Sequence, residues 1–157
     1  MISVGIYIDK DKNLIINSYR EDENGVLRSL KQYIYLETGW SKEELADAIV
    51  HSLEKDLRDE ETLIGEPDFW VRATGIKSFS AFSKRYKCID VDYIDTQNCY
   101  NITAEKRNSD GSYGVDKDEV LLRQRTYSGY PKRETIADEV LEAMKIDENI
   151  PCTTNVI

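Results

Sequence analysis

The chain has 157 residues, of which 40% are hydrophobic and 32% charged, and its formal net charge is −9. This length supports one ordinary core, so we expect a single domain over residues 1–157. The composition excludes a disordered tail, and the lack of a long apolar run excludes a membrane protein. The acidic balance argues against direct nucleic-acid binding and favours either solubility alone or a partner with a basic surface.

The cysteines and the N-terminal stretch both point to a cytoplasmic protein. Cys88, Cys99 and Cys152 are odd in number and widely spaced, which fits neither a disulfide framework nor a zinc motif. The opening "MISVGIYIDKDK" has none of the features of a signal peptide and alternates like a strand. We therefore expect a cytoplasmic location with reduced thiols.

Three strands are predicted in the first quarter of the chain. The runs Ile2–Ile8 and Asn13–Tyr19 are rich in β-branched and aromatic residues and are separated by the polar "DKDK", which predicts a hairpin. The turn signal "DENG" then precedes "VLRSLKQYIYLE", whose alternating pattern predicts a third strand ending near Glu37.

The stretch "SKEELADAIVHSLEK", Ser41–Lys55, predicts an amphipathic helix. Ser41 stands three residues before Glu44, the spacing of a capping box. An apolar stripe follows at helical spacing, which we expect to pack on the sheet. Its members are Leu45, Ile49 and Leu53, with Ala46, Val50 and Leu57 beside them.

A second helix is predicted over "PKRETIADEVLEAMK", Pro131–Lys145, with Pro131 at the first helical position. It repeats the first helix at a constant offset along the chain. The matched pairs are Leu45 and Ile136, Ala46 and Ala137, Asp47 and Asp138, Ile49 and Val140, and Leu53 and Met144. Because the shared positions are apolar, the simplest interpretation is two helices packed on one sheet, and a duplication stays open.

Between these helices, "PDFWVRATG" suggests a short strand or an extended loop, and "KSFSAFSKR" a short helix with Phe79 and Phe82 on one face. "YKCIDVDYID" alternates as a strand. "CYNITAEKR" and "EVLLRQRTY" are two further predicted strands around the hairpin signal "NSDGSYG". An extended tail is expected from about residue 146.

This order predicts an α+β (mixed α/β) domain with a single, mainly antiparallel sheet. Two amphipathic helices and a short third helix would pack on it. No glycine-rich phosphate loop occurs at a strand-to-helix junction, so we expect no nucleotide cofactor and no other cofactor.

Catalytic residues are hard to find in this sequence. His51 is the only histidine, and nothing near it offers a nucleophile. Asp90, Asp92 and Asp95 form the best carboxylate cluster, with the first two on one face of a strand. This cluster could be a solvent-exposed face or a guard of a strand edge, an acidic surface for a partner, or a metal site.

Tyrosines concentrate in the second half of the chain, beside aspartates and arginines. They include Tyr93, Tyr100 and Tyr113. Tyrosine combines a large contact area with a polar tip, which suits protein interfaces, although any one of these rings could also fill the edge of the core.

The stretch "FWVRATGIKSFSAFSKRYKCIDVDYID", the strand pair after it and the final "PKRETIADEVLEAMK" resemble the immunity proteins of bacterial contact-dependent growth inhibition systems. The likeness is strongest from about Gly75 to Lys145. It implies a cytosolic, non-catalytic inhibitor that binds the C-terminal toxin domain, often a nuclease, of a large secreted partner and blocks its active site.

An acidic inhibitor suits such a partner, because nucleases commonly have basic clefts that hold phosphates. We therefore place the hypothetical partner-binding residues at Asp90, Asp92, Tyr93, Asp95, Tyr100 and Tyr113. Two alternatives are a small carboxylate- or metal-dependent hydrolase centred on Asp90 and Asp92, and a non-catalytic adaptor subunit.

Overall fold

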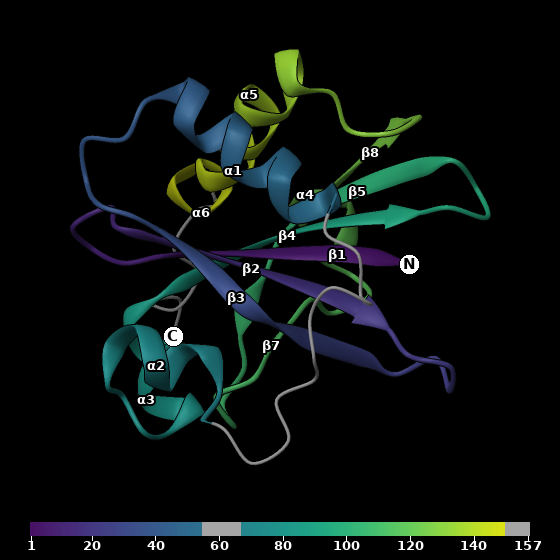
Figure 1. Cartoon of the computed structure of the whole chain (residues 1–157). Helices are drawn as coiled ribbons and strands as arrows, with labels where there is room; N and C mark the ends of the chain where they lie inside the picture. The colour runs from purple at the N-terminus through teal and green to yellow at the C-terminus, as the bar shows by residue number, and fades with distance from the viewer. Residues whose placement is uncertain (55–66, 150–157) are drawn as a thin grey trace, which may run out of the picture.

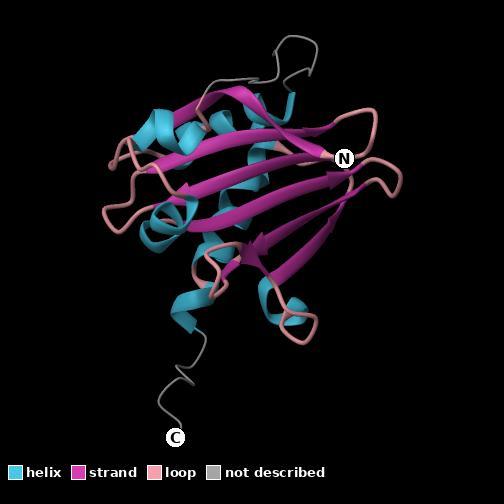
Figure 2. Cartoon of the chain, turned by 90° about the horizontal axis from the view of Figure 1, so that it is seen from below, coloured by secondary structure: helices cyan, strands magenta, loops and turns pink. Residues whose placement is uncertain are grey.

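Figures 1 and 2 show the computed structural model, which describes residues 1–54 and 67–149. Its main feature is a six-stranded antiparallel sheet with the order β3-β2-β1-β4-β5-β8. The strands are β1 (Ile2–Ile8), β2 (Leu14–Glu21), β3 (Leu27–Leu36), β4 (Lys87–Ile94), β5 (Cys99–Ala104), β6 (Lys106–Arg107), β7 (Tyr113–Gly114) and β8 (Gln124–Ser128). The helices are α1 (Lys42–Glu54), α2 (Phe69–Thr74), α3 (Phe79–Arg85), α4 (Val120–Arg123), α5 (Arg133–Met144) and α6 (Ile146–Asn149). The predicted α+β class with one antiparallel sheet is confirmed.

The first three strands follow the predicted hairpins, and an aspartate stabilises each turn. The Asp9 carboxylate accepts hydrogen bonds from the backbone amides of Asp11 and Asn13 between β1 and β2. Asp22 accepts from the amide of Val26 between β2 and β3. These side chains satisfy amides that the turns leave unpaired, which is the role that aspartate commonly has in turns.

Helices α1 and α5 lie side by side over one face of the sheet (Figure 1). The capping box is present, because the Glu44 amide donates to Ser41 Oγ at 3.1 Å and the Ser41 amide to Glu44 Oε1 at 3.4 Å. The stripe Leu45, Ile49 and Leu53 is buried against the sheet. Its predicted continuation to Leu57 lies outside the described residues.

Helix α5 starts later than predicted. Lys132 is its N-cap with an extended backbone, so Pro131 precedes the helix instead of opening it. Ile136 and Val140 are buried as expected, and Met144 is half-buried.

The strands of the sheet are arranged with the same internal symmetry as these two helices. Outward from the central β1–β4 pair, one side runs β1, β2, β3 and on to α1, and the other runs β4, β5, β8 and on to α5. The domain thus consists of two β-β-β-α units in a pseudo-twofold arrangement. Two helices that occupy equivalent places need the same apolar stripe, which explains why their sequences are similar.

Helices α2 and α3 cover the opposite face of the sheet. A second core lies under them, made of Tyr7, Ile15, Phe69, Phe82 and Cys88. The prediction of a strand or loop for the first of these segments was wrong. Phe69 and Ala73 recur at helical spacing and pack together on this core, and Gly75 ends the helix with a φ of 77°.

The region after β5 differs most from expectation. "NSDGSYG" is a turn, but it joins the short β6 and β7, while β5 pairs directly with β8. The predicted strand "EVLLRQRTY" splits into α4 and β8, because the buried Arg123 pairs with Glu119 one helical turn away.

The predicted extended tail begins instead with α6, whose Ile146 is buried. Residues 150–157 lie outside the described part. No described helix is long and apolar enough to cross a bilayer.

Candidate functional site

The six predicted binding residues are distributed over both faces and one end of the sheet. Strand β4 lies between β1 and β5, so the interpretation of its aspartates as guards of an exposed strand edge was wrong. Asp90 and Asp92 face the α2–α3 side and lie beside Gly5 and Ser3 of β1.

Tyr93 and Tyr100 are neighbours on the other face, the one that α1 and α5 cover. Asp95 follows the end of β4, and Tyr113 belongs to β7. The structure therefore joins only parts of this set, and whether any of the six contacts a partner stays a prediction.

Asp90 is part of a half-buried cluster of carboxyl groups. The Cys88 Sγ donates to its Oδ1 at 3.5 Å. Burial raises the pKa of Asp90, and the hydrogen bond that it donates to the Glu105 carboxylate raises this pKa further. Burial also raises the pKa of Glu105, and its hydrogen bond with Asp90 opposes this rise.

Asp92 lies in the same row as Asp90. Burial raises its pKa, and the hydrogen bond that it accepts from Ser3 Oγ opposes this rise. Because both side chains are only partly exposed, the row is more buried than the solvent-exposed acidic surface that the alternating pattern suggested.

This cluster gives little support to a hydrolase. The described residues contain no group of three or more histidine, cysteine or acidic side chains arranged to hold a metal ion. His51 lies exposed on α1, across the sheet from Asp90, so a histidine–carboxylate dyad does not form there. Burial instead raises the pKa of both Asp90 and Glu105, which makes it easier for two carboxyls to lie close together.

Two of the predicted tyrosines are held in internal contacts. Tyr100 is only 4% exposed, and its hydroxyl donates to Glu139 of α5 at 2.6 Å. The Tyr113 hydroxyl donates to the Tyr86 carbonyl at 2.6 Å. Burial raises the pKa of both phenols. Tyr93 is half-buried, and its ring meets Tyr130 edge-on at 4.8 Å between centroids.

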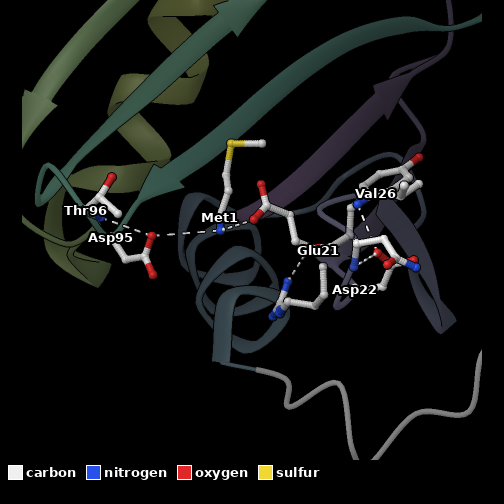
Figure 3. A network of polar contacts seen from close by, with 9 residues as sticks. Met1, Glu21, Asp22, Val26, Asp95 and Thr96 are labelled. Carbon is white, nitrogen blue, oxygen red and sulfur yellow. Dashed lines mark hydrogen bonds and ion pairs between the residues drawn. The ribbon is translucent and has the colours of Figure 1, made fainter.

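Asp95 lies among acidic side chains at one end of the sheet, which we call the acidic end: the exposed Glu21, Glu23 and Asp95 and the half-buried Asp22. Figure 3 shows how the chain terminus connects Glu21 and Asp95, since the Met1 ammonium lies 3.1 Å from Glu21 and 3.9 Å from Asp95. The Asp95 side chain is 69% exposed. Hydrogen bonds from the Val26 amide and the Arg28 side chain lower the pKa of Asp22.

Sequence reasoning found Asp95 and missed its neighbours. Glu21 ends β2 and Asp95 follows β4, and only their shared neighbour β1 brings these two strand ends together. The turn signal "DENG" was recognised, but nothing in a single sequence shows which turns share one end of a sheet.

These features define an α+β protein with one six-stranded antiparallel sheet covered by helices on both faces. No protein-family model and no curated protein sequence matches the chain. Solved structures share its fold. Among them is a protein of unknown function from Neisseria meningitidis, with a TM-score of 0.64 and 13% sequence identity over 92% of this chain and 94% of the other.

The second structural match is to the CdiA-CT/CdiI toxin and immunity complex from Yersinia pseudotuberculosis. Its TM-score is 0.60 and its sequence identity 13%, over 92% of this chain and 96% of the matched chain. At this level of identity the comparison shows a common fold.

Proposed function

We propose that this protein is a cytosolic immunity protein, which binds the toxin domain of a contact-dependent growth inhibition system and neutralises it by blocking its active site. The observation that carries the proposal is the fold shared with a chain of a toxin and immunity complex over 92% of this protein. The resemblance of Gly75 to Lys145 to immunity proteins supports it from the sequence.

An inhibitory role also agrees with the chemistry of the described residues. The half-buried carboxyls Asp90 and Glu105 lie on one face of the sheet and the exposed His51 lies on the other, so the described residues form no histidine–carboxylate pair there.

The acidic end is the part of the predicted surface best placed to meet a toxin. Asp95 and Glu21 are exposed, and their charges would attract a basic cleft and accelerate association. The side chains of Val26 and Leu27 on the adjoining turn are exposed as well and would give such a contact an apolar part. A toxin nuclease that binds phosphates would have a cleft of the required charge.

The test is calorimetric titration of this protein into the toxin domain encoded directly upstream of it, at low and at moderate salt. We expect one-to-one binding that weakens with salt and abolishes toxin activity. A growth assay with both genes co-expressed should show protection of the cells. If the two proteins do not bind and the cells are not protected, the proposal is wrong.

A further inference from the structure

A second charged region lies at the other end of β1 from Met1 and the acidic end. It is a cavity of about 620 Å³, here called the basic pocket, between the β1–β2 turn, the end of α3 and the β5–β6 segment. Its cationic lining comprises Lys10, Lys12, Lys84, Arg85, Lys87, Lys106, Arg107 and Arg123. In a chain with a net charge of −9, this concentration of positive charge is unexpected.

The three carboxylates that also line the pocket have partners of their own. Asp9 accepts hydrogen bonds from turn amides, Asp147 pairs with Arg123 at 2.8 Å, and Glu105 forms a hydrogen bond with Asp90. Three carboxylates do not balance the eight cations of the lining, so the pocket keeps an excess of positive charge.

Some of the cations are engaged as well. Lys106 and Arg123 pair with Glu119, and Arg107 donates to Ser83 Oγ at 2.9 Å. Five remain that form no ion pair with the described residues, and all five are exposed: Lys10, Lys12, Lys84, Arg85 and Lys87. Positive charges in excess of the nearby carboxylates repel one another, and an anionic ligand would relieve that repulsion.

The pocket also has an apolar part. Ile8, Ile89 and Met144 contribute to its lining, together with the ring of Tyr86, which stacks on Phe82 at 4.5 Å. A neighbouring cavity of about 680 Å³ shares Lys84, Arg85 and Tyr86 with it, so the concave surface continues past the end of α3. This shape is longer than a single small anion requires.

We propose that the basic pocket binds an acidic peptide segment of a partner protein, with an apolar side chain against the lining and flanking aspartates or glutamates on the lysines. The pocket lies at the C-terminal end of α3 and not at a helix N-terminus, where phosphate sites are typically found. Flexible lysines from several segments fit a peptide better than a compact phosphate. This inference stands independently of toxin binding.

The test uses a fluorescein-labelled peptide Asp-Glu-Asp-Phe-Glu-Asp-Glu and the full chain, with binding followed by fluorescence anisotropy at low salt. We expect saturable binding, weaker binding when alanine replaces the phenylalanine, and shifts of backbone amide resonances from Lys84 to Lys87. Lys84→Glu and Arg85→Glu should each weaken binding by about fivefold or more, because each reverses a charge at the rim.

Lys132→Glu is the matched control, since this exposed lysine outside the basic pocket changes the net charge equally. It should leave peptide affinity within about twofold of the wild type, as expected for screened, distant charges. Equal weakening by this control, or no binding of the peptide, overturns the proposal. Tighter binding of an oligothymidylate of equal charge, with the same sensitivity to Lys84→Glu, also overturns it and assigns the pocket to a phosphate-bearing ligand.

Discussion

Lys42 at the start of α1 forms an ion pair of 2.7 Å with Asp138 in the middle of α5. The equivalent residues form the mirrored pair, since Arg133 at the start of α5 lies 2.6 Å from Asp47 of α1. Such reciprocal contacts are what a twofold relation between antiparallel helices requires. The sequence similarity between the two helices therefore corresponds to a symmetrical packing interface inside one chain.

We predict that these ion pairs set the registry of the helices more than their stability. All four side chains are more than half exposed, so solvent and salt screen their attraction. Asp47→Ala and Arg133→Ala, alone and together in urea unfolding experiments, should each change the free energy of unfolding only slightly. The small coupling between them should shrink further at high salt. A loss as large as that of a core truncation would contradict this prediction.

Truncation of Phe82 should be severe. This side chain is fully buried, and its ring centroid lies 4.5 Å from that of Tyr86 and 5.4 Å from that of Tyr7. Phe82→Ala should lower the free energy of unfolding by about 3–5 kcal/mol, the usual cost of such a cavity. Phe79→Ala should cost less, because Phe79 is only half-buried. Urea titration of both variants measures the difference, and equal losses would show that α3 is not packed as described.

Stability should depend on pH through Asp90 and Glu105. Because the fold raises the pKa of both carboxyls, their contribution to stability is complete below the unfolded pKa of about 4 and is lost as the pH rises through the folded pKa. Asp90→Asn keeps a donor toward Glu105 and removes the ionisation of one group. The variant should therefore lose less stability than the wild type between pH 4 and pH 7.

Urea unfolding across this pH range measures that slope. Asp95→Asn is the control, since its exposed carboxylate lies outside the cluster. It should leave the slope nearly unchanged. A slope for Asp90→Asn as steep as that of the wild type would mean that the fold does not raise the pKa of Asp90.

Association with the proposed toxin should be sensitive to charge at the acidic end. Asp95→Lys should slow association and reduce its dependence on salt, while the dissociation rate changes less, because rim charges act mainly through steering. Asp118→Lys, an exposed aspartate outside the acidic end, makes the same change in net charge and should have a smaller effect. Stopped-flow kinetics at several salt concentrations distinguish the two, and identical rates would remove the acidic end from the interface.

Local sequence patterns were enough to predict most of the strands, the two long helices, the capping box of Ser41 and Glu44, and the class of fold. These features depend on local periodicity and on turn residues, which a short window of sequence contains. Local patterns failed where tertiary contacts decide the structure. The segment around Phe69 became helical because its apolar face packs on a second core, and α4 formed beside the buried Arg123.

Which charges lie close together depends on the three-dimensional arrangement of the strands and helices. The alternating pattern placed Asp90 and Asp92 correctly on one face of a strand, but whether that face is open to solvent depends on helices that pack over it. The acidic end and the basic pocket likewise combine residues from distant segments, such as Glu21 with Asp95 and Lys10 with Arg85. Charge–charge interactions act through space, so the order of strands in the sheet determines them and the order of residues along the chain does not.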